Sequence, residues 1–297
     1  MHSDERRIPR TVTLVAALAI ALAGCAANSS GSGAPSPAAP LSAPQIAAIV
    51  AAPDRSAADR ANDMRRKPEQ LLAFIGVRPG LAALDVSAAG GYTTELLARA
   101  IGPGGIVYGQ SRPPVASAAA PAPSAAEGGT SAASAPAVRP PPRRTSPEQL
   151  AERSSNLGAN HDAAAPIVAV VRPFESPVPP ERADRGLDLV TLMFNYHDLG
   201  WMGVDRAQLN AAVFRALKPG GLYVVADHAG RPGTGISEAG TLHRIEEAFL
   251  RGEVEAAGFR FVEGASFLRN PNDPRDKNTP EPPQPKDDFV LKFVKPR

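Results

Sequence analysis

Apolar and polar positions alternate along the chain in blocks that predict strands and helices in turn. Five short runs are apolar almost throughout, as expected of strands that a parallel sheet buries on both faces: 81–86, 106–108, 167–171, 187–193 and 222–226. Segments with helical spacing lie around and between them: 56–66, 68–75, 92–100, 147–156, 205–217 and 245–257. Two closing segments, 259–262 and 288–293, are expected to pair antiparallel at a sheet edge.

Repeated strand–helix units predict the fold class. The pattern indicates an α/β protein with a doubly wound, mostly parallel sheet, helices on both faces and an antiparallel edge strand at the C-terminus. In such sheets ligands bind at the carboxyl ends of the strands. Local signals mark some element ends, because Ser56 is a typical helix N-cap and Gly76 a typical helix stop.

The first 25 residues have the pattern of a bacterial lipoprotein signal. Arg6, Arg7 and Arg10 form a short basic region, and the apolar run at 12–21 suits a signal-peptide core because it is too short to span a bilayer. Residues 22–25 (Leu-Ala-Gly-Cys) resemble a lipobox, in which the sulfur of Cys25 takes a diacylglycerol. An ordinary signal peptide and a start assigned too early are the alternatives. We predict a signal peptide at 1–24 and a protein held on a bacterial envelope membrane by lipid on Cys25, facing the periplasm.

Two stretches have compositions that disfavour folding. Residues 25–44 are rich in Ser, Gly, Pro and Ala and predict a flexible tether. Residues 112–146 form an Ala/Pro/Ser-rich insertion that ends in a basic cluster. Such segments cannot bury enough apolar area to offset their ordering entropy. We therefore expect one domain at 45–297, interrupted by a disordered insertion.

Charge and cysteine content exclude several classes of function. The chain has 32 Lys and Arg against 30 Asp and Glu, a net charge of +2, which is too small for bulk electrostatic binding of nucleic acid. We expect no nucleic-acid partner. The single cysteine excludes an internal disulfide and a multi-thiolate metal site.

Three motifs resemble those of class I S-adenosylmethionine-dependent methyltransferases. The first runs from a strand into a glycine-bearing turn at 84–92 and continues to a second strand at 102–108. The second, 216–224, is similar to that family's entry to its fifth strand, and the third, 256–262, to its late helix-to-strand element. The similarity covers about 60–296 apart from the insertion. It implies a Rossmann-like methyltransferase fold, S-adenosylmethionine as the cofactor and a methyl acceptor that the sequence does not identify.

The resemblance places the methionine end of the cofactor against the turn after the first strand. Asp85 takes the position of the acidic residue that organises this turn and the methionyl ammonium. The family's three glycine positions are Ser87, Ala89 and Gly91 here, and Gly90 is a further permissive residue. Small side chains suit such a turn because the ligand must approach the backbone near a helix N-terminus. A tight turn without a ligand is the alternative.

Two further positions concern the nucleoside. Gln110 stands where the family has Asp or Glu, whose carboxylate accepts hydrogen bonds from both ribose hydroxyls. A carboxamide is neutral and one of its two heads donates. Ribose recognition is then weakened or different, and Gln110→Glu is expected to tighten cofactor binding. Phe174, after the third strand, is placed either to stack on adenine or to pack as an edge core residue.

A polar cluster follows the fourth predicted strand: Asn195, Tyr196, His197 and Asp198. In the family this point faces the transferred methyl group. His197 is the candidate general base, oriented by Asp198, with Tyr196 as a third catalytic candidate and Asn195 on the cofactor. The alternative is that His197 and Asp198 cap the next helix and only line the pocket.

Two other groups of charged residues are expected near this edge. Asp227 and His228 end the fifth strand and form a second acid–imidazole pair, but the spacing matches no standard ligand motif, so we expect no metal site. The helix before the first strand carries residues that form either a lid over the site or a solvated face: Arg60, Asp63, Arg65 and Arg66.

Two functional hypotheses follow. Asp85, Gly91 and the polar cluster favour an S-adenosylmethionine-dependent methyltransferase. The altered turn, Gln110 and a location outside the cytoplasm, where this cofactor is made, favour a non-catalytic lipoprotein that binds or scaffolds. A hydrolase is disfavoured because no Gly-x-Ser-x-Gly motif is present. The sequence predicts the methyltransferase.

Overall fold

Seven strands form one sheet in the order β3-β2-β1-β4-β5-β7-β6. Their bounds are β1 Ala82–Val86, β2 Ile106–Ser111, β3 Ile167–Val171, β4 Leu187–Met193, β5 Leu217–His228, β6 Arg260–Ala265 and β7 Asp288–Val294. The first five strands pair in parallel, whereas β7 pairs antiparallel with both β5 and β6. The doubly wound, mostly parallel sheet with an antiparallel pair at its edge is confirmed.

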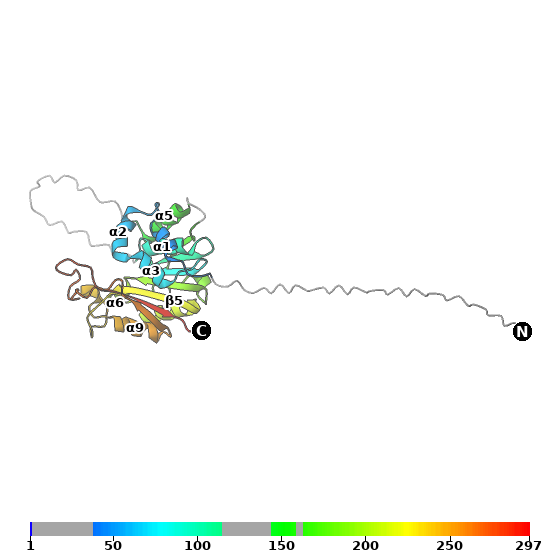
Figure 1. Cartoon of the computed structure of the whole chain (residues 1–297). Helices are drawn as coiled ribbons and strands as arrows, with labels where there is room; N and C mark the ends of the chain where they lie inside the picture. Colours follow the sequence, from blue (N-terminus) through cyan, green and yellow to red (C-terminus); the bar gives the residue numbers. More distant parts are fainter. Residues whose placement is uncertain (2–37, 115–143, 159–162) are drawn as a thin grey trace, which may run out of the picture. The chain divides into compact units, whose positions relative to one another are not determined.

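The computed structural model describes Met1 and residues 38–114, 144–158 and 163–297. Residues 38–297 form one unit, coloured along the sequence in Figure 1. The predicted signal peptide, Cys25 and insertion residues 115–143 lie outside the described residues. Within the part that is described, no helix is both long enough and apolar enough to cross a membrane.

Helices cover both faces of the sheet. They are α1 Ala43–Val50, α2 Ala57–Arg66, α3 Pro68–Ile75, α4 Tyr92–Ile101, α5 Ser146–Gly158, α6 Tyr196–Trp201, α7 Arg206–Ala216, α8 Ala239–Leu242 and α9 Glu247–Ala256, with a 3-10 turn at Pro180–Arg182. Ser56 caps α2 as predicted, because its side chain accepts a hydrogen bond from the Asp59 N–H at 3.0 Å. In Figure 1, α1, α3 and α5 lie on one side of the strands and α6 and α9 on the other.

The alternation of side chains along β1 separates two cores. Ala83 faces a core built with α1, α3, α4 and α5, whereas Leu84 faces a core built with α6, α7 and α9. Successive residues of a strand point to opposite faces, and all five residues of β1 are buried. This explains why the strand reads as one continuous apolar run apart from Asp85.

Two details of the prediction differ from the structure: the position of the last strand in the sheet and the end of the tether. The C-terminal strand is not the edge strand, since β7 lies inside and β6 forms the edge. The predicted tether ends earlier than residue 44, because the Leu41 N–H donates to the Val77 carbonyl at 2.9 Å and α1 begins at Ala43. Both differences arise from long-range pairing, which local composition does not report.

Candidate functional site

The parallel strands bring the predicted site residues to one edge of the sheet. Asp85 of β1 is in register with Gly109 of β2 and Thr191 of β4. The chain leaves β1 toward β2 on one side and returns through β4 on the other, so the strand order reverses at this position. A reversal of this kind opens a crevice at the carboxyl ends of the strands, where ligands of doubly wound sheets bind.

The turn after β1 has a glycine-like backbone. Ser87, Ala89 and Gly91 have φ values of 58°, 48° and 78°. For residues with a Cβ, this left-handed conformation costs roughly 1–2 kcal/mol each. Helix α4 begins at Tyr92, so its first free N–H groups face the turn. The chain thus keeps the backbone of a glycine turn although two of its three glycine positions hold Ser and Ala.

Helix α5 packs on the outside of this turn. A Cβ on Gly91 would lie only 2.7 Å from Leu150 Cδ2 and 2.8 Å from Arg153 Cδ, which makes glycine necessary here. Arg153 Nε donates to the Gly90 carbonyl at 2.5 Å, and the same guanidinium pairs with Asp59 on α2. Arg153 thereby joins two helices and the turn, a role that the sequence pattern did not indicate.

Asp85 is buried beneath the turn, between α4 and β4, and does not face the crevice. Its two carboxylate oxygens accept hydrogen bonds from the hydroxyls of Thr94 at 2.7 Å and Thr191 at 2.8 Å, and the residue is 2% exposed. Burial raises the pKa of Asp85 to about 6 despite these bonds. The predicted role in organising the turn fits this geometry, whereas direct contact with a ligand ammonium does not.

The structure corrects the expected role of Gln110. Its Oε1 accepts from the Ser87 N–H at 2.9 Å, and its Nε2 donates to the Arg172 carbonyl at 2.7 Å. The residue is fully buried. Both heads of the carboxamide are engaged inside the protein, so neither is directed toward a ribose in this conformation.

A small cavity of about 230 Å³ opens beside the turn. It is lined by the predicted residues Ser87, Ala89, Phe174, Asn195 and Asp198, together with Ser111, Arg112, Leu199 and Met202. Phe174 is 7% exposed and packs in the core while also lining this cavity. Pockets for small molecules commonly measure about 300–1,000 Å³, so the space shown here is smaller than such a ligand needs.

The predicted polar cluster centres on His197. Its Nδ1 lies 2.6 Å from Asp227 Oδ1, and its Nε2 lies 3.1 Å from Asp198 Oδ1. Asn195 Nδ2 donates to the other oxygen of Asp198 at 2.8 Å. Burial alone would lower the pKa of His197, but the hydrogen bonds with Asp198 and Asp227 raise it to about 9. With both ring nitrogens engaged, His197 is not poised as a free general base.

Asp198 receives several donors on one oxygen. Trp201 Nε1 donates to Oδ1 at 3.0 Å, and His243 Nδ1 lies 3.2 Å from the same atom. Burial would raise the pKa of the Asp198 carboxyl, but the hydrogen bond with His197 and the other donors hold it well below its ordinary value. His243, between α8 and β-bridge residue Ile245, was not singled out from the sequence, because nothing local to residues 242–245 links it to α6.

Tyr196 does not belong to the site. It is fully buried, its hydroxyl donates to Glu253 Oε2 at 3.0 Å and it accepts from Asn210 Nδ2 at 2.8 Å. These contacts place it in the core on the α7 and α9 side. The contacts of Tyr196 thus differ from those expected of a catalytic group, because its hydroxyl is bonded within the core and does not face the polar cluster.

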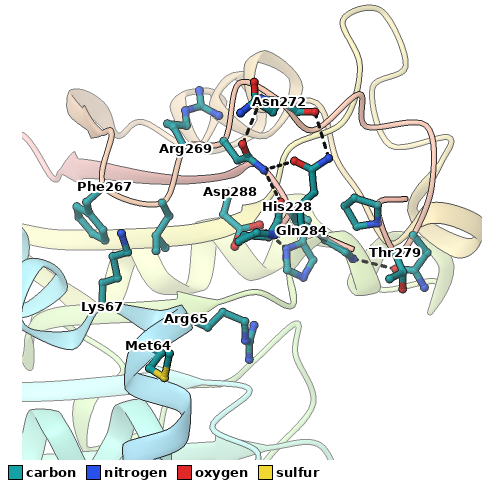
Figure 2. A pocket seen from close by; sticks show the side chains of 16 residues that line it. Met64, Arg65, Lys67, His228, Phe267, Arg269, Asn272, Thr279, Gln284 and Asp288 are labelled. Carbon is teal, nitrogen blue, oxygen red and sulfur yellow. Dashed lines mark hydrogen bonds and ion pairs between the residues drawn. The ribbon is translucent and has the colours of Figure 1, made fainter. Parts of the chain in front are cut away.

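A larger cavity of about 1030 Å³ lies beside His228, at the start of β7 and the end of α2 (Figure 2). His228 Nδ1 lies 2.6 Å from Asp288 Oδ1, and its ring centroid is 5.5 Å from that of His197. Arg65 of α2 and Lys67, which follows the helix, line the cavity, and neither forms an ion pair with a described residue. The His228 ring thus lies between this cavity and the polar cluster.

The four charged residues of α2 divide between the two expected roles. Arg65 lines the larger cavity, and the Arg66 guanidinium lies 4.0 Å from the centroid of the Phe194 ring at the end of β4. Asp63 pairs with Arg55 at 2.6 Å, and Arg60 donates to a backbone carbonyl of residue 52. The C-terminal turn of α2 therefore faces the site, whereas the rest of the helix makes structural contacts.

Comparison with known proteins supports the fold assignment. No family model and no curated protein matches the sequence. Among solved structures, an S-adenosylmethionine-dependent methyltransferase from Aquifex aeolicus is 15% identical, with a TM-score of 0.50 over 86% of this chain and 99% of that chain. An arsenic(III) S-adenosylmethionine methyltransferase from Chlamydomonas reinhardtii is 15% identical, with a TM-score of 0.47 over 74% of this chain and 64% of that chain. The chain has the class I methyltransferase fold.

Proposed function

We propose that this protein binds S-adenosylmethionine at the carboxyl edge of its sheet and catalyses methyl transfer to an acceptor. The observation that carries the proposal is the turn after β1, which has left-handed backbone at Ser87, Ala89 and Gly91 directly before α4. Two residues with side chains adopt a conformation that favours glycine. The cost of that conformation is consistent with a backbone shape that a ligand requires.

The residues present fit the methionine end of this cofactor. The turn offers small side chains and the N-terminus of α4, and Asn195 and Asp198 line the same cavity from the start of α6. The cofactor, when bound, supplies a methyl group on a sulfonium. The chain's own contribution is to hold the turn through Asp85 and to line the space with the side chains of Asn195 and Asp198.

The nucleoside end requires a rearrangement. A cavity of about 230 Å³ does not hold a complete nucleoside, and Gln110 joins the two strand ends that border it. We infer that binding separates the Ser87 and Arg172 sides of this carboxamide bridge. Preparing the site in this way reduces the apparent affinity, because the competent conformation must first be populated.

The larger cavity is the candidate acceptor site. Its lining includes the cationic side chains of Arg65, Lys67 and Lys286 and a single carboxylate, Asp288, which is paired with His228. Arg269 also lines the cavity, but its guanidinium is paired with Glu247 and Asp287. This balance favours an acceptor that carries negative charge. His228 lines this cavity and its ring lies 5.5 Å from that of His197, which supports the proposal that donor and acceptor meet beside the polar cluster.

Calorimetric titration of the purified full chain with S-adenosylmethionine, and with its demethylated product, tests the proposal. Ser111→Trp places a large ring in the smaller cavity and is expected to abolish binding. Ser155→Trp is the matched control, since Ser155 is an exposed residue of α5 that does not line this cavity. Binding that is unchanged in Ser111→Trp would place the cofactor elsewhere.

A second function, a non-catalytic binding module with this fold, is favoured by the engaged Gln110 carboxamide and by the small cavity. The same titration decides between them. If neither the cofactor nor its product binds at near-millimolar concentrations, the methyltransferase proposal fails and the binding module becomes the better account.

We also propose that the chain is a lipoprotein held on an envelope membrane. The support is the sequence at 22–25, which lies outside the described residues. Cys25→Ser is expected to abolish labelling by a radioactive or clickable fatty acid and to leave an unprocessed precursor. The same mass and the same membrane fractionation in the variant would contradict the anchor.

A further inference from the structure

We propose that His197, Asp198 and His243 form a binding site for a divalent transition-metal ion, with Zn²⁺ as the ion that best suits the donors. Single ligand atoms of these three residues lie within 4.8 Å of one another. Asp198 Oδ1 is 3.1 Å from His197 Nε2 and 3.2 Å from His243 Nδ1. Zinc bonds of about 2.0–2.1 Å place neighbouring ligand atoms of a tetrahedron roughly 3.3 Å apart. The observed spacing is therefore close to that of an occupied site.

A buried carboxylate orients the first ligand. Asp227 is fully buried, and its Oδ1 lies 2.6 Å from His197 Nδ1. Asp227 is itself held by the N–H groups of His197 at 2.7 Å and His228 at 2.8 Å. A carboxylate on one ring nitrogen directs the other nitrogen toward a metal and makes it a better donor. The ring of His197 is thus fixed with Nε2 toward Asp198.

The second ligand is oriented in the same manner. Asn195 Nδ2 donates to Asp198 Oδ2 at 2.8 Å, which leaves Oδ1 directed at the two histidines. Trp201 Nε1 also donates to Oδ1, at 3.0 Å. Each ligand on α6 therefore has a supporting hydrogen bond of its own, as expected of a built site rather than a chance cluster.

The charge of the cluster favours a cation. Asp198 and Asp227 lie on either side of one imidazole, and among the described residues no Lys or Arg forms an ion pair with either carboxylate. Metal binding displaces the proton of His197, and two carboxylates with neutral histidines then leave two negative charges in a largely buried place for the ion to neutralise. A divalent ion neutralises them without adding a side chain.

His243 brings the third ligand at a cost to its backbone. It ends α8 with φ 50° and ψ 55°, a left-handed conformation for a residue with a Cβ. Its side chain is 39% exposed, in contrast to 3% for His197. Three protein ligands leave the fourth position of a tetrahedral zinc site open, which is the arrangement of metal sites that bind substrate.

The open position lies between the two cavities. Asp198 lines the smaller one, and the His228 ring, 5.5 Å from the His197 ring, lines the larger one. An ion here can bind an oxygen of an anionic acceptor and lower the pKa of its hydroxyl. This role rests on the proposed methyl transfer, whereas metal binding itself does not.

The test is a titration of the tag-free full chain with Zn²⁺ and with Co²⁺ after removal of metal by a chelator and dialysis. We expect one tightly bound ion per chain and a visible Co²⁺ absorption band of a site with nitrogen ligands. His243→Ala and Asp198→Asn are expected to weaken binding about 100-fold or more. Asp227→Asn, which removes only the orienting charge, is expected to weaken it about 10- to 100-fold.

His228→Ala is the matched control. This histidine belongs to the same edge and contacts the His197 ring, but it is not among the three ligands. It should change the Zn²⁺ affinity less than threefold, and circular dichroism should show that every variant is folded. The proposal is overturned if the wild-type chain binds neither Zn²⁺ nor Co²⁺ with a dissociation constant below about 100 µM. It is also overturned if His228→Ala loses as much affinity for Zn²⁺ as His243→Ala. Because cofactor binding is measured separately, either proposal can fail alone.

Discussion

Gln110 and Ser87 are joined by a hydrogen bond in which the Ser87 N–H donates to Gln110 Oε1 at 2.9 Å. The other head of the carboxamide donates to the Arg172 carbonyl at 2.7 Å. One fully buried side chain therefore ties the turn after β1 to the end of β3. It spans the place where the resembled family has a carboxylate for the ribose.

Gln110→Glu is expected to destabilise the protein. A carboxylate has no N–H to donate to the Arg172 carbonyl, so one of its oxygens would face that carbonyl oxygen. An unsatisfied buried polar group costs about 1–3 kcal/mol. Urea unfolding at neutral pH measures the change. Ser111→Ala is the control, because the Ser111 hydroxyl forms no hydrogen bond with a described residue, and it should alter stability by less than about 0.5 kcal/mol. Unchanged stability with tighter cofactor binding would restore the role predicted from the sequence.

Asp85 is expected to make stability fall as pH rises from about 4 to about 6. Its folded-state pKa of about 6 lies above its unfolded value of about 3.9, so the folded state binds more protons in this window. The contribution is present below about pH 4 and is lost above about pH 6, on the order of 3 kcal/mol. Asp85→Asn does not titrate and should flatten this segment in urea unfolding series. Glu69→Gln, on the exposed face of α3, is the control and should keep the wild-type dependence of unfolding free energy on pH. The same dependence in wild type and Asp85→Asn would contradict the argument from burial.

Tyr196→Phe distinguishes a core residue from a catalytic one. Removing the hydroxyl leaves the Asn210 amide and the Glu253 carboxylate without a shared partner, at a cost of about 1–3 kcal/mol in unfolding free energy. Cofactor affinity and any methyl transfer should stay at the wild-type level when measured well below the melting temperature. Lost turnover without lost stability would return Tyr196 to the site.

Ala89→Gly is expected to stabilise the turn. Ala89 has φ 48°, and glycine adopts this conformation without a Cβ clash, a gain of up to about 1 kcal/mol after the extra entropy of the unfolded chain. Gly91→Ala is the opposing change, since its Cβ would lie 2.7 Å from Leu150 Cδ2 at φ 78°. The melting temperature should rise in Ala89→Gly and fall in Gly91→Ala. A fall in both would mean that the Ala89 side chain makes a contact that stabilises the turn.

The apolar pattern of the chain was enough to predict the strands, their parallel arrangement and the edge at which the candidate site lies. Apolar runs such as 187–193 report burial on both faces, and a turn at 87–91 requires small residues whatever surrounds it. These are local consequences of backbone geometry, so the pattern of the chain carries them. The predicted residues Ser87, Ala89, Asn195 and Asp198 accordingly line one cavity.

The partners of the polar groups depend on how separate elements pack, and the sequence pattern does not report them. Tyr196 and His197 are adjacent on α6, but successive residues of a helix point in different directions. The Tyr196 hydroxyl is therefore bonded to Glu253 of α9, whereas the His197 ring is bonded to Asp227 of β5. His243 reaches Asp198 across 45 residues of sequence through the packing of α8 against α6. A hydrogen bond depends on distance and angle between atoms of separate elements. Local sequence specifies that a group is polar, and the fold specifies whether it is free to bind a ligand.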